Sequence, residues 1–199
     1  MTQPFSIERT FTIAPAPATI WKGVCDAAAC AELIQHFKDT HDPEIHETYR
    51  DMRSVNRSAA LSACDPPASY VDGLNQFARV VCARFAMPVT GVSFILGRYQ
   101  AGARQAWHMD ANPDIDRQGA HRVASYSMLL SQPGEDFEGG ELEFAEGVAD
   151  FGRGDLAGFT ARTRHQVRPV LSGERFVVIA FAEYRDTFAK FRDDEGVAA

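Results

Sequence analysis

The chain lacks several features that would assign it to a membrane, to secretion or to nucleic acid. Its 199 residues contain no apolar run of transmembrane length, and no secretory pattern of a charged region followed by an apolar one is visible at the start. Lys and Arg number 20 against 27 Asp and Glu, so the formal net charge is −7. Non-specific binding to nucleic acid or to anionic membranes needs a basic surface. We therefore expect a cytoplasmic protein with no nucleic-acid and no membrane partner, and its oligomeric state stays open.

Cysteine is also scarce. The four thiols have no metal-finger spacing, and two of them fall in helical patterns. Such residues in a cytosolic protein are usually buried and reduced. We predict free thiols at Cys25, Cys30, Cys64 and Cys82.

The N-terminal part of the chain favours helices that support a sheet. We predict a single domain over residues 1–199, with an N-terminal strand and supporting helices in residues 1–88 and a jelly-roll core in residues 89–184. Apolar residues recur at helical spacing in residues 26–38 and 69–85. Neither apolar stripe carries a charge, so each helix should pack against a sheet.

Shorter patterns surround these helices. Alternating apolar residues predict a strand near the N-terminus, and residues 45–52 predict another. The alternating residues are Phe5, Ile7, Phe11 and Ile13. Residues 53–69 mix polar and apolar side chains and contain two prolines, so we predict a loop, whose part 53–68 is a candidate substrate lid.

From residue 89 onward, short strands alternate with Gly, Pro and Asp clusters. The predicted strands are residues 90–99, 104–108, 122–131, 140–145, 147–151, 155–160, 164–170 and 175–183. Eight short antiparallel strands in succession are typical of a double-sheet jelly roll. The predicted fold class is therefore α+β, a double-stranded β-helix (jelly roll) with N-terminal helices packed on the major sheet.

Two histidines and an aspartate form the main candidate site. His108 and Asp110 flank one residue, and on extended backbone their side chains point to the same face. A second imidazole, from His165, would complete a 2-His-1-carboxylate triad. Such a triad occupies one face of a non-haem Fe(II) and leaves positions open for other ligands. A lone histidine is more often a satisfied core residue, and Asp110 also suits the turn that follows it.

Arg175 opens the apolar strand that follows the Ser172-Gly173 turn. An arginine there is either at the solvated end of the strand, paired with Glu174 or Glu183, or directed into a pocket that holds an anion. Its guanidinium suits a planar carboxylate because it donates two parallel, charge-assisted hydrogen bonds.

The order His108-x-Asp110, His165, Arg175 resembles the Fe(II)/2-oxoglutarate-dependent oxygenases, in particular their prolyl-hydroxylase-like branch. The resemblance covers about residues 90 to 183. Further matching segments are Arg98-Tyr99, Ser127-Met128-Leu129-Leu130-Ser131, Gly139-Gly140-Glu141-Leu142, Gly154-Asp155-Leu156 and Gly173-Glu174-Arg175.

The resemblance implies a catalytic set of His108, Asp110, His165 and Arg175. The first three would bind Fe(II), and Arg175 would bind the distal carboxylate of the cosubstrate 2-oxoglutarate. Tyr99 and Ser127 would line the same pocket. The implied reaction consumes O2, with ascorbate as an optional reductant, converts 2-oxoglutarate to succinate and hydroxylates a peptidyl prolyl or a small amino-acid-like molecule.

Two departures from the family concern polar contacts. Gln105 stands where relatives often carry an aromatic hydroxyl, and Leu129 where some place a tyrosine. Two other classes of function stay open at this stage: a zinc hydrolase that uses a metal-bound water, and a non-catalytic module that binds metal or 2-oxoglutarate. Residues expected near the substrate are Trp107, Met109, Asn112 and Arg122.

Overall fold

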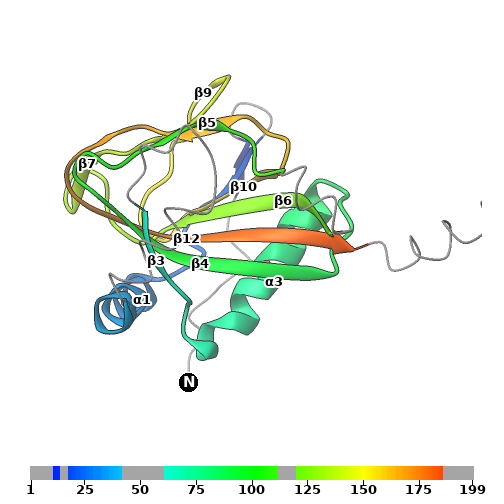
Figure 1. Ribbon diagram of the computed structural model, residues 1–199, viewed down its shortest axis with the longest axis horizontal. Coiled ribbons are helices and arrows are strands. Elements are labelled where there is room, and N and C mark those ends of the chain that lie inside the picture. Colours follow the sequence, from blue (N-terminus) through cyan, green and yellow to red (C-terminus); the bar gives the residue numbers. More distant parts are fainter. Residues whose placement is uncertain (1–10, 14–17, 42–60, 112–119, 186–199) are drawn as a thin grey trace, which may run out of the picture.

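The computed structural model describes residues 11–13, 18–41, 61–111 and 120–185. In this part of the chain, two helices cover one face of a large antiparallel sheet, and a smaller antiparallel sheet lies over its other face (Figure 1). This is the predicted double-stranded β-helix with helices on the major sheet, so the predicted fold class is confirmed.

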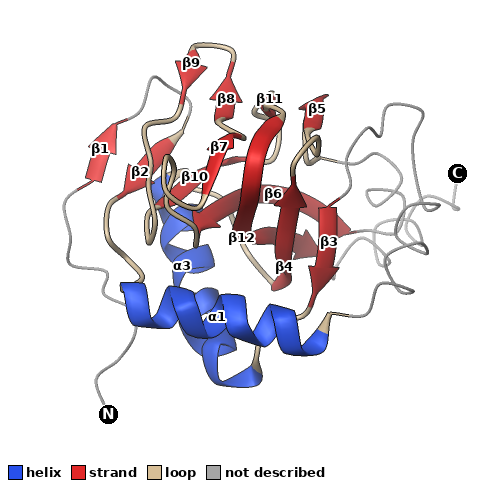
Figure 2. Ribbon diagram, turned by 90° about the vertical axis from the view of Figure 1, so that its left-hand side faces the viewer, coloured by secondary structure: helices blue, strands red, loops and turns tan. Residues whose placement is uncertain are grey.

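The helices lie close to their predicted bounds. Helix α1 (Ala27–Thr40) begins after Asp26, whose carboxylate accepts a hydrogen bond of 2.8 Å from the amide of Ala29. Helix α3 (Ala68–Arg84) follows Pro67, and both helices lie on the same side of the sheet (Figure 2). Neither described helix is long and apolar enough to cross a membrane.

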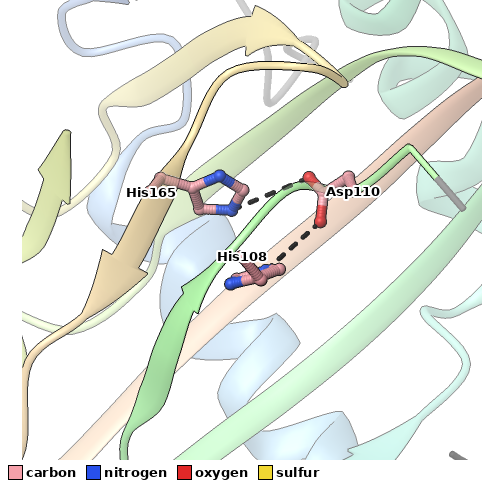
Figure 3. A group of neighbouring side chains, drawn as sticks. All are labelled: His108, Asp110 and His165. Carbon is pink, nitrogen blue, oxygen red and sulfur yellow. Dashed lines mark ion pairs between the residues drawn. The ribbon is translucent and has the colours of Figure 1, made fainter. Parts of the chain in front are cut away.

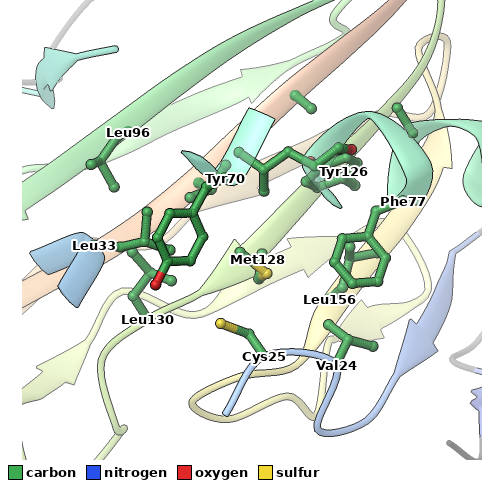
Figure 4. Close-up of a cluster of buried hydrophobic side chains, with 14 of the residues drawn as sticks. Val24, Cys25, Leu33, Tyr70, Phe77, Leu96, Tyr126, Met128, Leu130 and Leu156 are labelled. Carbon is green, nitrogen blue, oxygen red and sulfur yellow. Dashed lines mark hydrogen bonds between the residues drawn. The ribbon is translucent and has the colours of Figure 1, made fainter. Parts of the chain in front are cut away.

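The apolar stripes of both helices pack on the major sheet. Leu33 of α1 and Met128 of β6 are fully buried in one apolar cluster (Figure 4). Leu74 of α3 is fully buried in the same cluster. Burying a side chain of this size stabilises the fold by about 1.5–3 kcal/mol. The hydroxyl of Tyr126 also donates a hydrogen bond of 3.0 Å to the carbonyl of Leu74, which ties α3 to the sheet.

The two sheets contain all the described strands. The major sheet has the order β1 (Phe11–Ile13), β2 (Thr19–Trp21), β10 (Leu156–Thr160), β6 (Ala120–Leu129), β12 (Val170–Arg185), β4 (Gly91–Gln100) and β3 (Leu61–Cys64), and β7 (Phe137–Gly139) pairs with β12. The minor sheet has the order β5 (Gln105–His108), β11 (His165–Val167), β8 (Leu142–Phe144) and β9 (Gly147–Val148).

Strand β12 contributes to both faces of the major sheet, as its apolar sequence predicts. Val178 and Ala180 belong to the core beneath the helices, whereas Val177 belongs to the core between the two sheets. Alternation along the strand places Arg175 on the same side as Val177. The arginine therefore points into the space between the sheets.

Several predicted boundaries were wrong. The predicted loop 53–69 contains strand β3, since pairing with β4 outweighs its mixed composition. Ser172-Gly173 is not a turn before the last strand: β12 already begins at Val170 and pairs through this irregular segment with β7. Strands β2 and β7 are too short to give a periodic signal, and residues 5, 7, 45–52 and 53–60 lie outside the described residues.

Candidate metal centre and anion pocket

The two histidines meet because they are cross-strand partners. Strands β5 and β11 pair antiparallel, and in their register His108 lies directly opposite His165. The ring centroids are 4.2 Å apart. His165 also packs against Phe159 at 4.6 Å between centroids, so it is buried, whereas His108 is partly exposed. Sheet register therefore brings together two residues that are far apart in sequence.

Asp110 completes the group from just beyond the end of β5. Its carboxylate oxygens lie 3.4 Å from Nε2 of His108 and 3.7 Å from Nε2 of His165 (Figure 3). The candidate ligand atoms of the three residues all lie within 4.8 Å of one another. The structure thus brings together the three residues predicted to bind a metal.

Backbone carbonyls orient both imidazoles. Nδ1 of His108 donates to the carbonyl of Ala106 at 2.8 Å, and Nδ1 of His165 donates to the carbonyl of Thr163 at 2.9 Å. A carbonyl can only accept, so each Nδ1 carries a proton, and whenever a ring is neutral its Nε2 presents a lone pair. Such hydrogen bonds fix the tautomer and the ring orientation of metal-binding histidines.

The three groups set one another's charge. Burial would raise the pKa of Asp110, but the hydrogen bond to His108 and the charges of both imidazoles hold this pKa below its ordinary value. Burial lowers the pKa of His165 below its ordinary value. For His108, burial is outweighed by Asp110, and its pKa is raised. An ionised carboxylate beside a neutral, buried imidazole is a suitable donor set for a divalent cation.

The opposing wall of the site comes from β6, and one of its residues was not predicted to act there. Ser125 and Ser127 are buried and lie on the same face of β6 as Leu129. This face is directed at the core between the two sheets. The hydroxyl of Ser125 has no hydrogen-bond partner among the described residues, yet it lies close enough to Asp110 to help lower the pKa of that carboxyl. The sequence did contain a signal for Ser125: it stands two residues before Ser127 on a predicted strand, so both side chains were expected on the same face.

Arg175 is a buried cation with unused donors. It is 1% exposed, and its Nε and Nη2 atoms have no hydrogen-bond partner in the described part of the chain. Burial accordingly lowers the pKa of its guanidinium. The alternative of a surface arginine paired with Glu174 is wrong, since Glu174 binds Arg98 at 3.0 Å. A buried guanidinium with free donors is suited to a carboxylate that comes from outside the chain.

Tyr99 links the arginine to the three-residue group. It is the cross-strand partner of Arg175, whose guanidinium carbon lies 5.3 Å from the centre of the Tyr99 ring. Burial raises the pKa of the Tyr99 hydroxyl, which also feels the charges of Arg175 and Asp110. The Tyr99 phenol therefore lies within electrostatic range of both Arg175 and the three candidate metal ligands. A short dianion could extend from the guanidinium to a metal held by those ligands.

Glycine permits a close approach of the chain to Arg175. Gly140 has φ +66°, and a Cβ atom built on it would lie 3.0 Å from Cδ of Arg175. A cavity of about 330 Å³ also adjoins Arg175 and is lined by Phe137, Gln132, Phe151 and their neighbours. None of the three candidate metal ligands lines this cavity, so we do not assign the reaction to it.

The residues present fit the groups that the sequence predicts. Two imidazoles and one carboxylate form a facial donor set for Fe(II), and the unused donors of Arg175 fit the far carboxylate of 2-oxoglutarate. Which of the six predicted site residues contact these groups stays a prediction, with Tyr99 and Ser127 placed at the walls of the same space.

Comparison with known proteins finds similarity to one family. Residues 94–183 match the model of the 2OG-Fe(II) oxygenase superfamily. A PKHD-type hydroxylase of Synechococcus sp. (strain CC9605) is 33% identical over 158 residues, which are 77% of this chain and 65% of the relative. A PKHD-type hydroxylase of Shewanella baltica (strain OS155 / ATCC BAA-1091) is 33% identical over 95 residues, 45% of this chain and 42% of that protein. The chain thus spans less than two thirds of the length of these relatives.

Solved structures share the fold. A viral collagen prolyl hydroxylase from Paramecium Bursaria Chlorella virus-1, solved as a 2OG complex, superposes with a TM-score of 0.62 at 18% identity, over 83% of this chain and 95% of that one. A Pseudomonas putida prolyl-4-hydroxylase gives a TM-score of 0.62 at 17% identity, over 84% of this chain and 92% of that one. The match over residues 94–183 and the shared fold agree, and this part of the chain is similar to the 2OG-Fe(II) oxygenase superfamily.

Proposed function

We propose that this protein is an Fe(II)- and 2-oxoglutarate-dependent dioxygenase that hydroxylates a peptidyl prolyl or a small amino-acid-like substrate. The observation that carries the proposal is the pairing of a candidate 2-His-1-carboxylate group with a buried arginine that has unused donors. The PKHD-type and prolyl hydroxylase names of its relatives support the hydroxylation of a substrate of this class.

In this proposal, His108, Asp110 and His165 hold Fe(II). Iron held there would supply the chemistry of the reaction, in which one oxygen atom of O2 enters the substrate C–H bond and the other enters succinate as 2-oxoglutarate loses CO2. The carbonyls of Ala106 and Thr163 keep both Nε2 atoms directed at the metal. Phe159 and Phe144 pack around His165 and keep water from that side of the site.

Arg175 would bind the distal carboxylate of 2-oxoglutarate, because its Nε and Nη2 have no hydrogen-bond partner among the described residues. Tyr99 packs its ring against the guanidinium of Arg175, and the pKa of its hydroxyl responds to the charges of both Arg175 and Asp110. Ser127, on the neighbouring strand β6, contributes a buried polar side chain to the wall of the same space. Because all of these side chains stand on strands of a packed sheet, they keep their positions without the ligand.

The substrate would approach over the neighbouring part of the same face. Phe181 is the cross-strand partner of Ser125 and is nearly buried, and the guanidinium carbon of Arg122 lies 3.9 Å from the centre of its ring. This pair offers an apolar wall with a cation at its edge, suited to a ring such as that of proline and a neighbouring carbonyl. Asn112 lies outside the described residues.

Succinate formation tests the proposal. The protein, supplied with Fe(II), 2-oxoglutarate, ascorbate and O2, should release succinate, and release should rise when the true substrate is added. A variant with His108→Ala should release none. If the wild-type protein releases no succinate with any proline peptide but hydrolyses esters or amides when loaded with Zn²⁺, the zinc-hydrolase alternative replaces the proposal. A cytoplasmic location is part of the same proposal, because Fe(II) needs reducing surroundings.

A further inference from the structure

The outer side of the metal strand is exposed and apolar. Residues of extended backbone alternate between faces, so Trp107 and Met109 point away from the site into which His108 and Asp110 point. Trp107 is 38% exposed and Met109 is 54% exposed. Large apolar side chains this exposed are few in the described part of the chain, and two of them stand next to candidate metal ligands.

Two arginines adjoin this apolar pair. Arg162 and Arg164 are exposed and flank the buried Thr163 in the turn that precedes β11. The carbonyl of Ala161 accepts a hydrogen bond of 2.8 Å from the amide of Ala111, so this turn lies beside the chain that follows Met109. The guanidinium carbon of Arg164 lies 5.7 Å from the centre of the Trp107 ring. No salt bridge joins either arginine to another described residue, in contrast to Arg168, which binds Glu143. In a chain of net charge −7, two arginines that form no salt bridge within the described ranges give a local basic surface beside the candidate metal centre.

Backbone groups at this surface are also free to pair. Strand β5 is at the edge of the minor sheet, and among the described residues it pairs only with β11. Edge strands present unpaired amides and carbonyls, which proteins usually protect because another chain can pair with them. An extended peptide that adds to such an edge gains main-chain hydrogen bonds, and side-chain contacts give it specificity.

We propose that Trp107, Met109, Arg162 and Arg164 form a docking surface for an acidic segment of a polypeptide substrate. That this polypeptide is a substrate rests on the proposed function, whereas its binding to the surface does not depend on catalysis. Charge complementarity selects an acidic partner, since neither arginine forms a salt bridge with a carboxylate of the described residues. Among the described strands β5 pairs on one side only, and this edge, with the exposed Trp107 and Met109 beside it, suits an extended chain better than a small molecule. Because Arg164 precedes the candidate ligand His165, acidic residues would lie a few positions from the hydroxylated residue.

Peptide binding tests the surface directly. The probe is a short fluorescein-labelled peptide with a central proline flanked by glutamates, and matched peptides carry glutamine or lysine instead. Fluorescence anisotropy is measured with protein loaded with Mn²⁺ and 2-oxoglutarate. The wild type should bind the glutamate peptide most tightly and the lysine peptide least, and added salt should weaken the binding.

Charge reversal locates the site. The double variant Arg162→Glu/Arg164→Glu should weaken binding of the glutamate peptide by roughly 10-fold or more, since two attractive pairs become repulsive. The matched control Arg79→Glu/Arg84→Glu changes the net charge equally on exposed residues of α3, beneath the other face of the major sheet, and should bind as the wild type does.

Trp107 is one of two tryptophans, and the other, Trp21, is buried. Binding should therefore change tryptophan fluorescence in the wild type but not in Trp107→Phe.

The outcomes separate this proposal from the proposed function. Equal binding of the three peptides, or unchanged binding in the double variant with an unchanged melting temperature, overturns the docking surface even if succinate is released. Tighter binding of a single-stranded oligonucleotide than of the glutamate peptide, or complete competition by free glutamate, also overturns it. Charge-selective binding without any succinate release leaves the docking surface standing and removes the hydroxylase.

Discussion

Replacing Arg175 should uncouple the affinity for 2-oxoglutarate from the stability of the fold. The guanidinium is 1% exposed, so solvent does not screen its pairing with a bound carboxylate. Arg175→Ala leaves that carboxylate desolvated and unpaired, at a cost of about 3–5 kcal/mol, with water entry pulling the loss towards the lower end. At about 1.4 kcal/mol per factor of ten, 2-oxoglutarate affinity should fall by roughly two to three orders of magnitude.

An apolar replacement of Arg175 should leave the ligand-free protein as stable as the wild type or more stable, although it lowers the affinity for 2-oxoglutarate. Nε and Nη2 of Arg175 have no partner among the described residues, so the ligand-free fold bears the cost of burying them. Replacing a buried charge by an apolar side chain of similar length is often neutral or stabilising, by about 1–4 kcal/mol. Arg175→Met should therefore match or exceed the melting temperature of the wild type while it loses 2-oxoglutarate binding.

Calorimetric titration of 2-oxoglutarate into the Mn²⁺-loaded variants gives the affinities, and thermal unfolding without ligand gives the stabilities. Arg175→Lys is the matched variant, because a point charge replaces a bidentate donor pair and should recover part of the affinity. Mn²⁺ affinity should barely change in any of them, since Arg175 is not in the candidate metal group. Wild-type 2-oxoglutarate affinity in Arg175→Ala would refute the reasoning.

Three further predictions concern the metal, the glycine beside Arg175 and the thiols. Alanine at any one of the three candidate ligands should abolish stoichiometric Mn²⁺ binding in calorimetry while circular dichroism stays native, and a variant that binds normally would show that its residue is not a ligand. Gly140→Ala should weaken 2-oxoglutarate binding by about tenfold, since its Cβ would crowd Cδ of Arg175; Gly102→Ala, with φ +86° and open space around it, is the control for backbone strain and should bind normally. All four cysteines are free in the structure. Alkylation of the protein after unfolding without a reductant should therefore label four thiols, as read by mass spectrometry. A native disulfide would contradict the expected cytoplasmic location.

Local patterns were sufficient for the elements that carry the site. The alternation of His108 and Asp110 on extended backbone predicted that both face the same way, and the structure bears this out. The apolar run after Arg175 predicted a strand over residues 175–183, and β12 contains that run, with buried residues on both faces. These features depend on the two-residue period of a strand, which sequence displays directly.

Features that depend on pairing between distant strands could not be predicted in this way. Nothing in the sequence places His165 opposite His108, because register is set by the whole sheet. Strand β3 has an unremarkable composition and exists because β4 offers it an edge. The orphan hydroxyl of Ser125 and the carbonyl that orients His165 are likewise products of tertiary structure.

Anaerobic titration with Fe(II) and 2-oxoglutarate tests the central claim most directly. If His108, Asp110 and His165 hold Fe(II) while Arg175 holds the far end of 2-oxoglutarate, adding both should produce the metal-to-ligand charge-transfer absorption of chelated 2-oxoglutarate, saturating at one equivalent of each. Arg175→Ala should require far more 2-oxoglutarate to reach the same absorption, and Asp110→Ala should show none. Stoichiometric binding of Fe(II) to the wild type without this absorption at saturating 2-oxoglutarate would contradict the account.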